Sequence, residues 1–161
     1  MVNIELRKWT YGDAAEVLRA FQADDMRTQT SWPIVTLKDA EGWIAAWEGV
    51  GHAFAVMLDG RAVGNVAITN IDAHLNGWVS YWTAADRRGL GVATAATGLI
   101  AEWAFTERGL FRLVLNHWVG NTASCRVAVK AGFLAEGVER GRLLYDGVRH
   151  DVERHARLAT D

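Results

Sequence analysis

Two arginines and two closely spaced glycines stand directly before an amphipathic stretch in RRGLGVATAATGLIAEWAF, residues 87–105. Small residues let successive backbone N–H groups approach a ligand closely, and the first N–H groups of a helix are free to bind an anion. Arg87 and Arg88 add positive charge beside them. The spacing Arg88-x-x-Gly91-x-Ala93 therefore predicts an anion site at a helix start. A glycine-rich turn with solvated arginines is the simpler alternative.

Two other phosphate-binding motifs do not fit this segment. A P-loop has Lys followed by Ser or Thr after its last glycine, and the segment has no such pair. A dinucleotide fingerprint has Gly or Ala at its sixth position, where this chain has Thr94, and the segment lies past the middle of the chain. An unrelated nucleotide-binding α/β domain stays open as an alternative.

The surrounding elements alternate in type. Period-two patterns predict strands at residues 4–9, 52–58, 61–69, 76–83, 111–118, 135–145 and 148–158. Helical spacing and capping residues predict helices after Thr10, after Thr36, from Val92 to near Arg108, and from Asn121 to Gly132. The strands at 76–83 and 111–118 flank a helix and should run parallel. We expect one α/β (α+β) domain over residues 1–161, with four helices and a mixed, mostly antiparallel sheet of about seven strands.

The composition limits the class of protein. The chain has 161 residues, half of them hydrophobic, and a net charge of −2, so no basic surface points to nucleic acid. Cys125 is the single cysteine, which excludes an internal disulfide and fits a reducing, cytoplasmic location; we expect it to be a buried, inert thiol. The start MVNIELRKW predicts no signal peptide, and no apolar run predicts a membrane span.

Four segments resemble the Gcn5-related N-acetyltransferase (GNAT) superfamily, and within it the ribosomal-protein-alanine acetyltransferase (RimJ/RimL-like) branch. RGLGVA at 88–93 matches the family signature Arg/Gln-x-x-Gly-x-Gly/Ala, and NTASCRVAVKAGF at 121–133 matches the branch pattern Asn-x-x-Ser with a Lys-x-Gly-Phe ending. GWVSYWT at 77–83 matches the fourth strand, and residues 136–158 match the final hairpin. Their mutual distances and the order of elements agree with that fold.

The resemblance implies acetyl-coenzyme A (acetyl-CoA) as the donor. Its pyrophosphate would lie on the N–H groups of residues 88–93, and its pantetheine arm would enter a gap between splayed strands 76–83 and 111–118. Arg126 and Lys130 lie four residues apart on one helix face and would either meet the 3′-phosphate or be solvated. The predicted cofactor-binding residues are Tyr81, Trp82, Thr83, Arg87, Arg88, Gly89, Leu90, Gly91, Val92, Ala93, Asn121, Arg126 and Lys130. We expect no metal.

The resemblance also implies two residues for the transfer itself. Asn121 would contact the pantetheine arm, and Ser124 would give a proton or hydrogen bond to the leaving sulfur. Each has a structural alternative, since Asn121 suits a helix N-cap and Ser124 could bond back to a carbonyl. The implied enzyme is an N-acetyltransferase (an acyltransferase) that works by direct transfer in a ternary complex.

The general base is the open part of this prediction. Many members of the branch carry Glu where this chain has Trp78, and Ser80 replaces a Gly. His117 is the predicted base, because an imidazole titrates near neutral pH. Asp72, His74 or water are alternatives. A non-catalytic acyl-CoA-binding module is the alternative function.

The acceptor is expected to be a primary amine, either of a small molecule or of a protein N-terminus. Residues 24–35 and 145–150 would set its specificity. Five tryptophans would wall an aromatic cleft that attracts an ammonium group: Trp32, Trp43, Trp47, Trp78 and Trp82. Trp43 and Trp47 fit better as the buried face of one helix. The predicted substrate-binding residues are Trp32, Trp78, Asp72 and Tyr145, and a homodimer is compatible with the branch.

Overall fold

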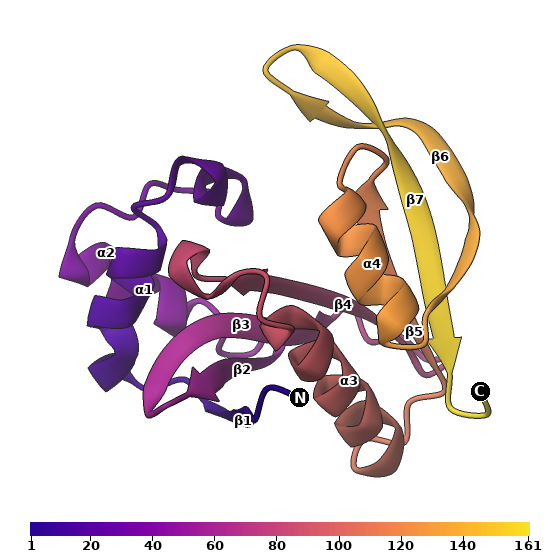
Figure 1. Ribbon diagram of the computed structural model, residues 1–161, viewed down its shortest axis with the longest axis horizontal. Coiled ribbons are helices and arrows are strands. Elements are labelled where there is room, and N and C mark those ends of the chain that lie inside the picture. The colour runs from indigo at the N-terminus through magenta and orange to yellow at the C-terminus, as the bar shows by residue number, and fades with distance from the viewer.

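Seven strands form one sheet in the order β1-β2-β3-β4-β5-β7-β6 (Figure 1). The computed structural model describes all residues from 1 to 161. The strands are β1 (Glu5–Lys8), β2 (Gly51–Leu58), β3 (Arg61–Thr69), β4 (Asn76–Thr83), β5 (Arg112–Trp118), β6 (Leu134–Tyr145) and β7 (Val148–Leu158). Every neighbouring pair is antiparallel except β4 and β5. The predicted α/β (α+β) class with a mixed, mostly antiparallel sheet is confirmed.

Four α-helices connect the strands, as predicted. They are α1 (Ala14–Ala20), α2 (Leu37–Ala45), α3 (Val92–Thr106) and α4 (Thr122–Lys130), with short 3-10 turns η1 (Tyr11–Asp13), η2 (Asp24–Gln29) and η3 (Ala85–Arg87). The Thr36 capping box forms as expected, since Asp39 N–H donates to Thr36 Oγ1 at 3.1 Å and Thr36 N–H donates to Asp39 at 2.9 Å. No helix combines the length and apolar character that crossing a lipid bilayer requires.

Two hydrophobic clusters cover opposite faces of the sheet. One joins α3 and α4 to the central strands, and the other joins α1 and α2 to the end of β4. Side chains alternate along a strand, so Val79 and Tyr81 belong to the first cluster while Trp82 belongs to the second. The Tyr81 side chain therefore lies on the face of the sheet that α3 and α4 cover.

Asp13 anchors the start of the first helical segment. Its carboxylate accepts hydrogen bonds from both terminal nitrogens of Arg7 at 2.7 Å and from the N–H and hydroxyl of Thr10 at 3.0 and 3.1 Å. The Arg7 hydrogen bonds lower the pKa of Asp13 against the opposing effect of burial. Asp13 therefore favours the folded state in its ionised form.

Replacing Asp13 by Asn should lower the free energy of unfolding by about 1–2 kcal/mol at neutral pH, because the amide loses the charged acceptor. The folded-state pKa lies below the unfolded one, so this stabilisation is present above the unfolded pKa and is lost as pH falls through the folded pKa. Urea denaturation at neutral and strongly acidic pH measures it. Asp24 is an exposed carboxylate with no ion pair, so Asp24→Asn should leave the free energy of unfolding unchanged at both pH values. A difference that persists in acid would contradict the assignment.

Candidate functional site

The parallel strands β4 and β5 separate soon after they start. Only residues 76–78 of β4 pair with residues 112–114 of β5. Beyond Trp78, β4 continues beside β3 and β5 continues beside β7, so the facing edges of residues 79–83 and 115–118 diverge (Figure 1). The predicted splayed pair is confirmed. The open edge of β4 leads to η3 and then to the start of α3.

The start of α3 presents a run of free backbone donors. Gly89 and Gly91 have φ values of 77° and 82°, in the left-handed region that favours glycine, and Gly91 is the residue before the helix. No backbone N–H from Gly89 to Thr94 donates to a group of the protein; the first that does is Ala95, to Gly91 O at 3.0 Å. No acidic residue lies in the first turn. These donors and the helix dipole make an anion-binding site.

Carboxylates hold the two arginines of this loop. Arg88 donates from Nε to the carbonyl of Thr83 at 3.0 Å and from Nη2 to Asp25 at 3.1 Å. The hydrogen bonding by Arg88 lowers the pKa of Asp25. Arg87 donates to Asp86 at 3.1 Å. Arg88 thus ties the end of β4 to η2, and the backbone amides are left as the free donors of the loop. No sequence signal pointed to Asp25, which lies 63 residues from Arg88.

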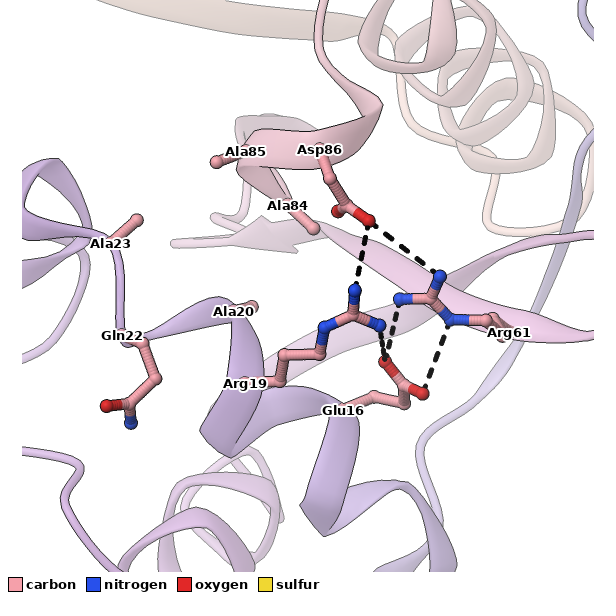
Figure 2. Close-up of a pocket in the computed structure, with 9 residues that line it drawn as sticks. All are labelled: Glu16, Arg19, Ala20, Gln22, Ala23, Arg61, Ala84, Ala85 and Asp86. Carbon is pink, nitrogen blue, oxygen red and sulfur yellow. Dashed lines mark hydrogen bonds and ion pairs between the residues drawn. The ribbon is translucent and has the colours of Figure 1, made fainter.

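An ion-pair network supports η3 from below, in a surface hollow of about 260 Å³ (Figure 2). Glu16 of α1 contacts Arg61 of β3 at 3.2 Å, and Asp86 of η3 contacts Arg19 at 3.3 Å and Arg61 at 3.8 Å. Each acidic group already has basic partners. We infer that these ion pairs stabilise the loop that carries the free amides, and that the hollow is not a substrate site.

Two hydroxyl groups meet between β4 and α4. Tyr81 Oη on β4 lies 2.7 Å from Ser124 Oγ on α4. Burial raises the pKa of Tyr81, and the hydrogen bond with Ser124 opposes that rise in part. Asn121 caps α4, because Ser124 N–H donates to Asn121 Oδ1 at 3.1 Å, so its N-cap role is confirmed. The sequence predicted Tyr81 as a cofactor-binding residue but did not predict this hydroxyl pair.

His117 does not join this pair. Its Nδ1 lies 2.8 Å from the carbonyl of Trp118, its Nε2 lies 3.1 Å from His155 Nε2, and the residue is 7% exposed. Both ring nitrogens thus face groups other than Tyr81 and Ser124. The structure therefore does not support His117 as the base that accepts a proton from the amine.

Asp72 and His74 lie before the start of β4, at the end where β4 is paired with β5 and far from its open end. The Asp72 carboxylate accepts from the N–H groups of His74 and Asn76 at 2.9 and 3.0 Å and from Asn76 Nδ2 at 3.0 Å, and the Asn76 bonds chiefly lower its pKa. These bonds shape the β3–β4 turn, where β4 is still paired with β5. The eight residues of β4, roughly 25 Å of extended chain, separate this turn from the open end. The structure thus assigns Asp72 a role in the turn, and its predicted role in substrate binding stays a prediction.

The tryptophans do not form one cleft. Trp43 and Trp82 are 4% and 6% exposed and pack against one another with ring centroids 5.7 Å apart, and Trp47 packs on Trp43 at 5.9 Å. The predicted buried helix face is confirmed for Trp43. The Trp82 side chain points into the core beneath α1 and α2, which corrects its assignment to the cleft. Only the backbone of Trp82 remains available to a cofactor.

Trp78 is occupied by other side chains. The guanidinium groups of Arg142 and Arg154, from β6 and β7, lie 5.0 and 5.5 Å from its ring centroid. Two protein cations already use the attraction that an acceptor ammonium would need. The role of Trp78 in recognising the amine stays a prediction, to be weighed against this contact.

Two other predicted acceptor residues are accessible. Trp32, 39% exposed, lines a pocket of about 400 Å³ formed by the segment between α1 and α2. Tyr145, also 39% exposed, lies at the tip of the β6–β7 hairpin, where its ring centroid is 5.9 Å from that of His150. Arg126 and Lys130 are exposed on α4 without an ion pair. The roles of these four residues stay predictions.

The GNAT acetyltransferase domain model matches residues 3–134, and the chain belongs to this family. It is 33% identical over 103 residues to the putative ribosomal N-acetyltransferase YdaF of Bacillus subtilis (strain 168), covering 63% of this chain and 56% of that protein. The chain thus spans just over half the length of this relative.

Solved structures agree with this family. Mycobacterium smegmatis RimJ in complex with CoA-disulfide is similar at 28% identity and a TM-score of 0.87, covering 98% of this chain and 82% of that one. RimL, the ribosomal L7/L12 alpha-N-protein acetyltransferase in complex with coenzyme A, has a TM-score of 0.87 over 98% of this chain and 95% of that one. At 18% identity the RimL match shows the fold. Within this family the chain is thus similar to RimJ and to a putative ribosomal N-acetyltransferase.

Proposed function

We propose that this protein is an acetyl-CoA-dependent N-acetyltransferase that moves an acetyl group to a primary amine by direct transfer in a ternary complex. One arrangement carries the proposal: the free amides at the start of α3 follow the unpaired end of β4, where the Tyr81 hydroxyl contacts Ser124 of α4. The names and ligands of YdaF, RimJ and RimL support the same donor and reaction.

The cofactor would use backbone more than side chains. Its pyrophosphate would accept hydrogen bonds from the N–H groups between Gly89 and Thr94. Its pantetheine arm would lie along the unpaired edge of β4, in the way that a peptide adds to a sheet edge. The thioester carbonyl would then lie near the backbone of residues 81–83, whose donors would stabilise the developing oxyanion. Arg126 and Lys130 are free to meet the 3′-phosphate.

The leaving group would take its proton from the hydroxyl pair. The amine nitrogen attacks the thioester carbon, the carbon–sulfur bond breaks, and the sulfur receives a proton from Ser124. Because the raised pKa keeps Tyr81 protonated, its phenol can donate to Ser124 Oγ and leave the Ser124 proton directed at the sulfur. Tyr81 then returns a proton to Ser124 and is itself reprotonated from solvent, while the nitrogen loses its extra proton to water.

No side chain of the site serves as the base for the amine. Trp78 stands where the resemblance implies a Glu, and the ring nitrogens of His117 face the Trp118 carbonyl and His155 instead of Tyr81 and Ser124. We therefore expect water to deprotonate the acceptor. As pH rises, kcat/KM should increase until the free amine is neutral, and acceptors of lower pKa should reach the plateau at lower pH. Rates measured over pH for two acceptors of different pKa test this, and an inflection near neutral pH common to both would contradict it.

A panel of amines tests the function. The full chain is incubated with acetyl-CoA and N-terminal peptides, polyamines or amino acids, and the release of free thiol is measured. Release with one class above the hydrolysis background supports the proposal and identifies the acceptor. Calorimetry with coenzyme A is the parallel measurement, and absence of both binding and release would overturn the proposal.

A non-catalytic acyl-CoA-binding module is the second candidate, and Trp78 in place of the carboxylate favours it. Such a module would bind coenzyme A yet release no thiol with any acceptor. It would also show no difference between the unaltered chain and Ser124→Ala.

A further inference from the structure

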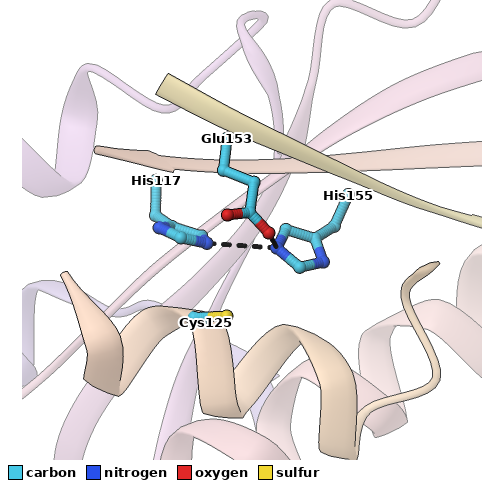
Figure 3. Close-up of side chains that lie close together, drawn as sticks. All are labelled: His117, Cys125, Glu153 and His155. Atoms are coloured by element: carbon cyan, nitrogen blue, oxygen red, sulfur yellow. Dashed lines mark hydrogen bonds and ion pairs between the residues drawn. The ribbon is translucent and has the colours of Figure 1, made fainter. Parts of the chain in front are cut away.

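Four side chains of metal-binding type converge between α4 and the strands β5 and β7 (Figure 3). They are His117 on β5, Cys125 on α4, and Glu153 and His155 on β7. The antiparallel register places His117 opposite Glu153, and His155 follows two residues later on the same face. One ligand atom from each side chain lies within 4.8 Å of the others. The proposed acetyl transfer does not use this cluster.

The ring orientations leave electron pairs facing one another. His117 Nδ1 is 2.8 Å from the Trp118 carbonyl and His155 Nδ1 is 3.4 Å from the Phe133 carbonyl. Carbonyl oxygens only accept, so each Nδ1 is the donor and each Nε2 of a neutral ring carries a lone pair. The two Nε2 atoms lie 3.1 Å apart, and a Glu153 oxygen lies 2.9 Å from His155 Nε2.

A cation among these groups would satisfy the lone pairs that face one another. A single shared proton would satisfy the two rings and the carboxylate, but it would leave the thiol of Cys125 unused. A metal ion would use all four groups. Carbonyl partners at Nδ1 are also the usual means by which proteins orient metal-binding histidines.

We propose that His117, Cys125, Glu153 and His155 bind one divalent transition-metal ion of the zinc type. In a tetrahedral zinc site the metal lies about 2.0–2.3 Å from its nitrogen, oxygen and sulfur ligands, which places the ligands themselves about 3.3–3.7 Å apart. The distances of 2.9 and 3.1 Å and the limit of 4.8 Å need only small side-chain movements to reach that arrangement. Two imidazoles, a thiolate and a carboxylate are a ligand set that zinc accepts.

Burial and charge agree with a structural site. His155 is 0% exposed and His117 is 7% exposed. Thiolate and carboxylate balance the charge of a divalent ion, and binding releases the thiol proton to solvent. Four protein ligands leave no open position for water, so the ion would be structural and not catalytic. It would fix α4, which carries Ser124, to β5 and β7.

Cobalt(II) is the probe for this site. The full chain is purified without a histidine tag, treated with a chelator and titrated with cobalt. We expect one cobalt ion per chain, with the intense visible bands of tetrahedral coordination and a near-ultraviolet thiolate-to-cobalt band, and zinc should displace it. Absence of stoichiometric binding of either metal would overturn the proposal.

Variants assign the ligands. Cys125→Ser should remove the thiolate band, and His155→Asn should weaken cobalt binding by about tenfold or more. His150→Asn, a change of another histidine on β7, is the matched control and should bind as the unaltered chain does. Unchanged spectra and affinity in both ligand variants would overturn the assignment.

The unaltered chain provides a measurement that does not depend on the folding of a variant. Cys125 is its single cysteine, so the rate of alkylation reports this thiol alone. Zinc should slow that alkylation and raise the melting temperature. An alkylation rate that zinc leaves unchanged would count against the site.

Discussion

Replacing Ser124 by Ala should lower kcat by about 10²–10⁴-fold while the Kd for coenzyme A stays nearly unchanged. The substitution removes the hydroxyl that we assign to the leaving sulfur. It leaves the helix cap in place, because the backbone N–H of Ser124, and not its side chain, donates to Asn121. Steady-state release of free thiol gives kcat, and calorimetry with coenzyme A gives the Kd.

Two further variants test the same assignment. Tyr81→Phe should lower kcat less, by about tenfold, since Ser124 keeps its proton but loses the phenol that orients it. Thr122→Ala, an exposed residue in the first turn of α4, is the matched control and should retain full activity. A Ser124→Ala protein with unchanged kcat would exclude Ser124 as the acid. A loss of coenzyme A binding in that variant would instead indicate a damaged fold.

Replacing Ala93 by Glu should weaken coenzyme A binding by about 100-fold. The new carboxylate would lie in the first turn of α3, beside the free amides that we propose bind the pyrophosphate. Two unit charges about 5 Å apart in an effective dielectric of about 20 repel one another by roughly 3 kcal/mol, which corresponds to that loss. Calorimetry at low and high salt measures it, and salt should restore part of the affinity.

The same substitution separates binding from folding. An acidic residue in the first turn of a helix stabilises it, so the melting temperature of the free protein should stay the same or rise slightly. Leu99→Glu adds the same charge to an exposed position farther along α3 and should leave the Kd near that of the unaltered chain. Equal effects of the two glutamates would show that net charge, and not the start of α3, governs binding.

Local patterns in the sequence determined the elements and the loop chemistry. Strand alternation, the caps at Thr36 and Asn121, and the glycines at 89 and 91 each depend on contacts among a few neighbouring residues. For that reason the order of strands and helices, the parallel pair and the free amides at the start of α3 were all predictable from the chain.

Only the tertiary structure decided which distant side chains meet. The Tyr81–Ser124 pair spans 43 residues, the Arg88–Asp25 pair 63 and the His117–His155 pair 38. Each spacing is far longer than one helix or strand, so strand pairing and helix packing, and not a local pattern, bring the partners together. The same contacts turned His117 away from the proposed reaction and toward a cluster that no linear motif predicts. The sequence by itself determined the elements and the anion-binding loop, and the packing of the sheet decided the partners of each reactive group.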